Sequence, residues 1–331
     1  MDDSVRACLE QLAGASLTED SWKQAQLQLK RGGLGLRSCR KHAAAASLAS
    51  RAATSDLCAQ LYPGFDNADY NGDAGALAAA AQDYNGNVLA ADQIVFNAQE
   101  HRNQKLLSGK VDDAVHAELW QRASPALKAH LNLGAAPGAG AFLQAPPSEA
   151  LGTNFPNSLM QIALQRRLRH QLLDEEAFCP ACGEVMDTYG DHALVCSCRG
   201  DRTKRHNCLR NQAFHDALAA GYTGAELERP GLLPPRAAGE GPTEGETNGS
   251  DLDDDGRRPA DVYVPRWRNG TAAAWDFAIT SGLRADLLAA SAASADAATD
   301  RYEEFKNEHL GTSRRCAKAG LTFIPLVCEA P

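Results

Sequence analysis

The chain has 331 residues, enough for about two domains of roughly 150 residues each. Its formal net charge of -9 argues against a protein that binds nucleic acid through overall positive charge, and polar residues interrupt its alanine-rich stretches, so we expect no membrane span. The first residues contain neither a basic segment nor an apolar run, which argues against a secretory signal. Ten cysteines in such a chain indicate an intracellular, reduced protein whose clustered cysteines bind metal.

The first half of the chain is predicted to be helical. Apolar side chains at helical spacing predict helices over four stretches: 1–30, 43–61, about 89–132 and 156–173. Ser38 is expected to cap the second of these helices after the glycine-rich stretch 32–35. Residues 62–88 are rich in Pro, Gly, Asn and Asp and are predicted to form turns, and residues 134–147 are predicted to be a linker or surface loop.

The second half changes character after a predicted helix over 202–220. Short strands are predicted over four stretches: 225–229, 261–264, 271–280 and 321–327. A helical region over 283–318 is expected to break near Gly311. A Pro/Gly-rich and then acidic stretch, about 231–257, is predicted to be a disordered insertion. This order of elements indicates a small α/β domain.

Three thiols and one imidazole lie at metal-binding spacing near the middle of the chain. Cys179 and Cys182 can reach one ion from a single tight turn, and His192 and Cys196 are spaced to share one face of a helix. Zinc takes four such ligands in a tetrahedron, so the pattern predicts a structural zinc site. Cys198 is an alternative fourth ligand, and four unconnected buried residues are the simpler interpretation.

A basic cluster follows these cysteines, although the whole chain is acidic. Its members are Arg199, Arg202, Lys204, Arg205 and Arg210. Such a local patch is compatible with contacts to phosphate groups. Seven acidic residues with no Lys or Arg among them lie between Glu240 and Asp255, which is also compatible with an acidic surface that meets a protein partner.

Two aspartates of the predicted C-terminal domain are spaced to meet in a hairpin. Asp261 opens one predicted strand and Asp276 lies on the next, so both carboxylates can reach the same end of a sheet and form a hard oxygen site suited to Mg²⁺. Lys306, on a predicted helix face that it shares with Tyr302, can position a water or stabilise a phosphoryl oxygen, and Glu228 can add a third carboxylate. Strand aspartates and helix lysines are also common without such a role.

Together these residues resemble the C-terminal part of the reverse transcriptase polyproteins of site-specific non-LTR retrotransposons that carry a restriction-like endonuclease. The matched residues are Cys179, Cys182, His192 and Cys196; Arg205, His206 and Asn207; Arg258, Pro259, Ala260 and Asp261; Asp276; and Tyr302 and Lys306. The resemblance implies a helical, thumb-like region over 1–155 and a linker helix with a zinc module over 156–204. It further implies a restriction-endonuclease-like mixed sheet with flanking helices over 205–331.

The same resemblance implies a zinc-containing, DNA-binding protein with an endonuclease that nicks duplex DNA. Asp261 and Asp276 would bind Mg²⁺, and Lys306, Glu228 and Tyr302 would complete the catalytic site. The residues implied to bind DNA are Arg202, Lys204, Arg205, His206 and Arg258. Element RNA is a further candidate partner, and a nuclear location follows from the resemblance alone.

The chain also departs from the family. Ala260 separates Pro259 from Asp261, and Ala278 stands where related nucleases often carry a lysine. The paired aspartates of a polymerase palm are not found, so we expect no copying of RNA. These departures keep open the alternative of a catalytically inactive, nucleic-acid-binding remnant. The net charge of -9 and the acidic run 240–255 keep open a second alternative, an acidic interaction scaffold with a structural zinc.

Overall fold

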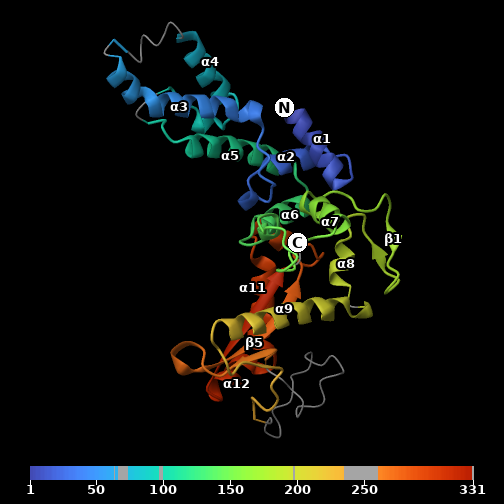
Figure 1. The fold of residues 1–331 in the computed structure, drawn as a ribbon. Coiled ribbons are helices and arrows are strands. Elements are labelled where there is room, and N and C mark those ends of the chain that lie inside the picture. Colours follow the sequence, from blue (N-terminus) through green and yellow to red (C-terminus); the bar gives the residue numbers. More distant parts are fainter. Residues whose placement is uncertain (63, 66–73, 97–99, 197, 235–259, 330–331) are drawn as a thin grey trace. The chain divides into compact units, whose positions relative to one another are not determined.

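The computed structural model describes residues 1–62, 64–65, 74–96, 100–196, 198–234 and 260–329. The fold is mixed helix and sheet, 55% helical, with a four-stranded mixed sheet and a two-stranded sheet, which confirms the predicted class at that level. The chain forms two compact units, Met1–Leu172 and Leu173–Pro331, and the strands lie in the second (Figure 1). The predicted division at 155/156 and 204/205 stays a prediction.

The described part of the first unit is built from helices. They are α1 (Asp2–Ala13), α2 (Glu19–Gln26), α3 (Cys39–Leu61), α4 (Ala74–Asn85), α5 (Gln104–Arg122), α6 (Pro125–Ala135) and α7 (Asn157–Arg167), with short 3-10 turns η1 (Leu29–Arg31), η3 (Ala90–Asp92) and η4 (Ala141–Leu143). The predicted cap is confirmed, because Ser38 Oγ accepts the backbone N–H of Lys41 at the start of α3. Leu48, Tyr84 and Val111 form a core between α3, α4 and α5.

The prediction of turns over residues 62–88 is wrong for α4. The alanine-rich run before Tyr84 has high helix propensity, and the fully buried Tyr84 anchors it against α3 and α5. The turn-forming residues Asn85 and Gly86 mark the end of the helix. Of the other turn signals in this range, residues 63 and 66–73 lie outside the described part of the chain.

The predicted helix over 156–173 ends early, at a buried arginine. Arg167 is 6% exposed and donates to three carbonyl oxygens, those of Gly134 at 2.7 Å, Leu29 at 2.9 Å and Gly33 at 3.2 Å. A Cβ on Gly33 would lie 2.0 Å from the carbonyl oxygen of Leu27, so only glycine fits there. Gly33 of the glycine-rich stretch is therefore one of three acceptors for a buried guanidinium. Helix α7 ends there because Arg169 has a left-handed backbone (φ 49) and the N–H of His170 bonds back to the Gln165 carbonyl at 2.8 Å.

His130, on α6, makes the first unit sensitive to acid. The side chain is 3% exposed, and its Nε2 lies 3.1 Å from the carbonyl oxygen of Arg167. Burial lowers the pKa of His130 from 6.5 to about 4. Between these two pH values the imidazole binds a proton in the unfolded chain but stays neutral in the folded chain. We expect the free energy of unfolding to be highest above pH 6.5 and to lose about 3 kcal/mol as the pH falls towards 4. Urea unfolding at a series of pH values measures this loss.

The matched control for that prediction is His130→Gln, which keeps an amide near Arg167 and removes the titration. Its free energy of unfolding should lose about 3 kcal/mol less than that of the parent over the same pH interval. Equal pH dependence of the two proteins would rule out His130 as the origin of the acid sensitivity.

The second unit contains the sheets. Its elements are β1 (Ala177–Phe178), β2 (Val185–Met186), α8 (Asp191–Val195), η5 (Cys198–Gly200), α9 (Asp201–Ala219), β3 (Glu226–Leu227), β4 (Val262–Val264), η7 (Arg268–Gly270), β5 (Ala272–Thr280), α10 (Leu288–Ala293), α11 (Ala297–Glu308), η8 (His309–Gly311), α12 (Thr312–Lys318) and β6 (Leu321–Glu329). The larger sheet has the order β3-β4-β5-β6, antiparallel except for the parallel pair β5 and β6. The expected break near Gly311 is confirmed, because Leu310 and Gly311 both have positive φ there.

Successive side chains of β5 point to opposite faces of the sheet. Trp275 and Phe277 point into a core that α9 closes with Leu209, Ala213 and Phe214. Asp276 lies between them in sequence and therefore points to the opposite face, where α11 packs. Helices thus cover both faces of the sheet, and three of the predicted catalytic residues, Asp261, Asp276 and Lys306, meet beside β5.

Candidate functional site

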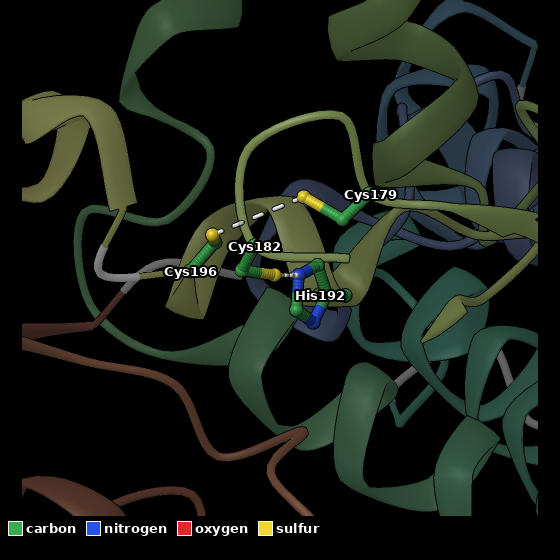
Figure 2. A group of neighbouring side chains, drawn as sticks. All are labelled: Cys179, Cys182, His192 and Cys196. Atoms are coloured by element: carbon green, nitrogen blue, oxygen red, sulfur yellow. Dashed lines mark hydrogen bonds between the residues drawn. The ribbon is translucent and has the colours of Figure 1, made fainter. Parts of the chain in front are cut away.

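Cys179, Cys182, His192 and Cys196 form a cluster that could hold a metal ion. Their ligand atoms all lie within 4.8 Å of one another, with the Sγ atoms of Cys179 and Cys196 3.9 Å apart and Cys182 Sγ 3.1 Å from His192 Nε2 (Figure 2). A tetrahedral zinc site with Zn–S bonds of about 2.3 Å would separate its sulfur atoms by about 3.8 Å. The donor set and spacing therefore fit a single ion. Cys196, rather than Cys198, completes the group.

A small hairpin positions the two thiols of the Cys-x-x-Cys turn. Strands β1 and β2 pair Phe178 with Val185, and the turn between them closes through hydrogen bonds from Cys179 N–H to the Glu184 carbonyl and from Gly183 N–H to the Cys179 carbonyl, both 2.8 Å. Gly183 has φ 80, a conformation that glycine adopts without strain. Backbone N–H groups of Ala181 and Cys182 lower the pKa of Cys179 to about 6, which favours the thiolate that binds metal.

Asp187, which the sequence analysis did not single out, positions the other two ligands. Its carboxylate accepts the backbone N–H groups of Tyr189, Asp191 and His192 at 2.9, 3.1 and 2.8 Å, and so caps the start of α8. The signal that could have revealed it is an aspartate followed within three residues by glycine, a sequence typical of such side-chain-capped turns.

We expect Asp187→Ala to lower the metal affinity of the cluster by about 10- to 100-fold, because the side chain that orients His192 is lost while all four ligands remain. Competition with a chromophoric chelator measures the affinity. Asp174→Ala, at an exposed acid upstream in the same unit, is the control and should bind as the parent does. Unchanged affinity in Asp187→Ala would show that the ligands are oriented without this cap.

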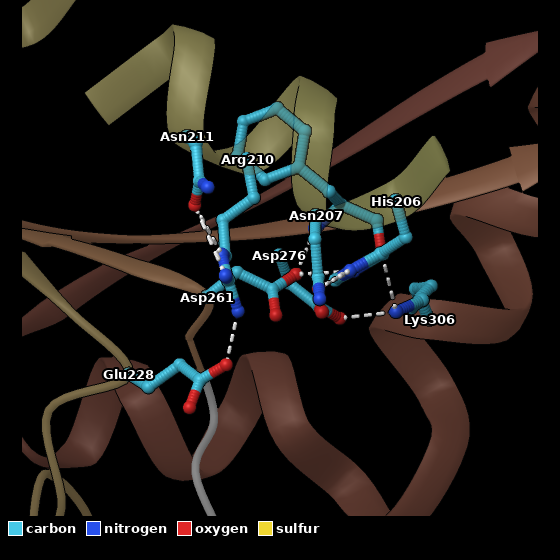
Figure 3. Close-up of polar contacts among 9 residues, drawn as sticks. His206, Asn207, Arg210, Asn211, Glu228, Asp261, Asp276 and Lys306 are labelled. Carbon is cyan, nitrogen blue, oxygen red and sulfur yellow. Dashed lines mark hydrogen bonds and ion pairs between the residues drawn. The ribbon is translucent and has the colours of Figure 1, made fainter. Parts of the chain in front are cut away.

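The structure brings Asp261 and Asp276 together, as the hairpin spacing predicted, and Lys306, the candidate lysine of the predicted helix, joins them. Lys306 Nζ, from α11, lies 2.7 Å from Asp276 Oδ2 and 3.3 Å from the carbonyl oxygen of Phe277. Asp261 Oδ2 accepts the backbone N–H of Phe277 at 2.6 Å and lies 3.0 Å from His206 Nε2. The two carboxylates lie side by side between Lys306 and His206 (Figure 3).

The two aspartates differ as acids. Burial raises the pKa of Asp276 above its ordinary value, the Lys306 ammonium offsets part of that rise, and the Asp261 carboxylate adds to it. Burial alone would also raise the pKa of Asp261, but hydrogen bonds from His206 and from the Phe277 N–H lower it below its ordinary value. Asp261 is therefore the stronger acid of the two, and each carboxylate has one basic neighbour, His206 for Asp261 and Lys306 for Asp276.

The other predicted catalytic residues lie nearby without joining the two aspartates. Glu228 has a positive φ of 45, its N–H bonds to the Asp261 carbonyl at 2.9 Å, and its carboxylate pairs with Arg210 of α9 (Figure 3). Arg210 was predicted only as part of a basic patch, and no spacing rule links it to Glu228. Tyr302 is on α11 with Lys306, and its ring packs edge-on against Phe305 with centroids 5.8 Å apart.

The residues predicted to bind DNA divide into three groups. Arg202 and Lys204 are exposed on α9, where Lys204 pairs with Asp201 at 3.2 Å. Arg205 and His206 are only half-exposed and contact protein groups. Arg258 lies outside the described residues, as does the predicted insertion from residue 235 onwards.

No protein-family model, curated protein or solved structure matches this chain. Among the described helices, none is both long and apolar enough to cross a membrane.

Proposed function

We propose that the second unit is a metal-dependent DNA endonuclease of the restriction-like type, joined to a structural zinc module. The observation that carries the proposal is the convergence of Asp261, Asp276 and Lys306, from β4's start, β5 and α11, on one point of a mixed sheet. Two carboxylates and an ammonium at one point are the groups that phosphodiester hydrolysis needs.

The residues present fit both ions. Cys179, Cys182, His192 and Cys196 offer the sulfur and nitrogen donors that zinc prefers, and Asp261 and Asp276 offer the hard oxygen donors that Mg²⁺ prefers. A bound Mg²⁺ would supply charge stabilisation at the phosphoryl oxygens and would lower the pKa of a water.

The chain's own groups have separate parts in the proposed reaction. Lys306 carries a positive charge next to Asp276 and can donate to a phosphoryl oxygen or to the attacking water. Burial of the pair on a covered sheet face lowers the local dielectric constant and strengthens these contacts. The exposed Arg202 and Lys204 of α9 would contact the phosphate backbone of duplex DNA.

A catalytically inactive, nucleic-acid-binding remnant is the second candidate, and one observation favours it. Each aspartate already has a protein partner, His206 for Asp261 and Lys306 for Asp276, and Glu228 is held by Arg210. In a decayed enzyme these contacts would persist as structural ion pairs.

One experiment separates the two candidates. Purified protein is incubated with supercoiled duplex DNA in Mg²⁺ or in EDTA, and its DNA affinity is measured over a range of salt concentrations. Nicking in Mg²⁺ that EDTA stops supports the endonuclease. Salt-dependent binding without cleavage under any divalent ion supports the remnant. A nuclear location and binding of element RNA stay predictions.

A further inference from the structure

Two adjacent residues of α9 contact different clusters. Arg205 Nη2 donates to the carbonyl oxygen of Leu194 at 2.6 Å, and His206 Nε2 lies 3.0 Å from Asp261 Oδ2. Leu194 lies in α8, between the ligands His192 and Cys196. One helix of 19 residues therefore contacts the metal cluster through one residue and the acidic pair through the next.

The position of Leu194 depends on the metal cluster. Helix α8 has only five residues, which is too short to be stable by itself. Its conformation is held by the Asp187 cap and by the ligands His192 and Cys196, which flank Leu194 on both sides. A bound ion fixes both flanking residues and so fixes the carbonyl group between them.

The position of Arg205 depends in turn on Leu194. The Arg205 Nη1 atom is buried without a hydrogen-bond partner among the described residues, and Nη2 donates to the Leu194 carbonyl. Arg205 as a whole is half-exposed, but its buried Nη1 leaves the Nη2 contact with Leu194 to hold this end of the guanidinium. When the Leu194 carbonyl moves, this part of α9 loses that contact.

Asp261 is held by two donors, one of which comes from α9. The ladder between β4 and β5 begins at the pair Val262 and Trp275, so the N–H of Phe277 bonds to the Asp261 side chain instead of to a strand. His206 is the second donor to the same Oδ2 atom. Without His206, the Asp261 carboxylate can rotate away from Phe277. The Phe277 N–H, on the side of β5 that faces β4, then loses its hydrogen bond.

We propose that His206 is a positioning residue for Asp261, and that Arg205 makes its position depend on metal in the Cys/His cluster. Zinc binding at the cluster is then transmitted through α9 to the acidic pair. The role of Asp261 in catalysis rests on the proposed function. The coupling between the Cys/His cluster and Asp261 can be measured without any DNA cleavage.

Amide hydrogen exchange at Phe277, followed by NMR in the full-length chain, is the direct test. His206→Ala in the zinc-loaded protein should speed exchange at Phe277 by about tenfold, the factor expected for loss of one charge-assisted hydrogen bond. His206→Gln should restore most of the protection, because its side-chain amide can donate from nearly the same position. The amides of β5 that face β6 serve as internal references.

The metal arm of the test uses the parent and Arg205→Ala. Removing zinc from the parent should speed exchange at Phe277, whereas Arg205→Ala should exchange rapidly with and without zinc. Gln212→Ala, which removes an exposed contact with Asp216 on the same helix, is the matched control and should behave as the parent does.

Two results would overturn the proposal: parent-like exchange at Phe277 in zinc-loaded His206→Ala, or equal exchange in zinc-loaded and zinc-free parent. If zinc removal unfolds the second unit, the comparison is made between zinc-loaded Arg205→Ala and the zinc-loaded parent. Parent-like exchange at Phe277 in Arg205→Ala then overturns the proposal. Coupled exchange without any nicking would leave the coupling standing and reject the endonuclease, so the two failures are distinguishable.

Discussion

Asp276→Ala is expected to abolish Mg²⁺-dependent nicking, with a loss of at least about a thousandfold in rate. Asp276 lies between Asp261 and Lys306, so its removal takes away one proposed metal ligand and the partner that holds the lysine. The loss is expected in the chemical step rather than in DNA affinity, because the groups of α9 that are proposed to contact DNA remain. Nicking of supercoiled DNA under single-turnover conditions measures the rate.

The control for this prediction is Asp286→Asn, which changes the charge equally at an exposed acid paired with Arg284. It should nick at the parent's rate. Circular dichroism establishes whether Asp276→Ala is folded, since loss of a half-buried ion pair can also destabilise the sheet. Nicking at the parent's rate by folded Asp276→Ala would disprove the endonuclease proposal.

Cys179→Ser is expected to release the metal and to destabilise the second unit by about 5 kcal/mol or more, since structural zinc contributes roughly 10 kcal/mol or more in small zinc domains. Cys179 is 6% exposed and anchors the hairpin that carries Cys182. Metal content by atomic spectroscopy and denaturant unfolding with and without a chelator measure the two effects.

Cys198→Ser is the matched control, because it removes a thiol two residues from Cys196 that does not belong to the cluster. It should keep about one metal ion per chain and the parent's stability. Loss of metal from Cys198→Ser, together with its retention in Cys196→Ser, would contradict the ligand assignment. A metal-free Cys179→Ser protein with unchanged stability would show that the cluster has no structural role.

Most of the successful predictions came from the spacing of residues close together in the sequence. The Cys-x-x-Cys turn and the His-x-x-x-Cys spacing are short enough for local backbone geometry to bring each pair of ligands together. The hairpin and the Asp187 cap then bring the two pairs to one point. The hairpin between Asp261 and Asp276 is similar, because a turn of a few residues sets the register of two antiparallel strands. The predicted strand near Phe323 and the helix that carries Lys306 also follow from residue pattern.

Long-range packing explains where the predictions were wrong or incomplete. Helix α4 was missed because turn-forming residues flank an alanine run whose stability depends on burial of Tyr84 against α3 and α5. Helix α7 ends early at Arg169, a residue other than glycine with a left-handed backbone, which no residue pattern indicates. The carbonyl acceptors of the neighbouring Arg167 lie more than 30 residues away in sequence and are equally invisible to local spacing.

Residue types and their spacing were enough to predict the four-ligand cluster, the acidic pair and the strands of the larger sheet, because these depend on local residue patterns. Which groups surround Asp261 became known only from the fold. His206 is 55 residues away in sequence and reaches it because α9 packs against β4 and β5. Side-chain partners across such distances are fixed by packing, and packing depends on the whole unit at once.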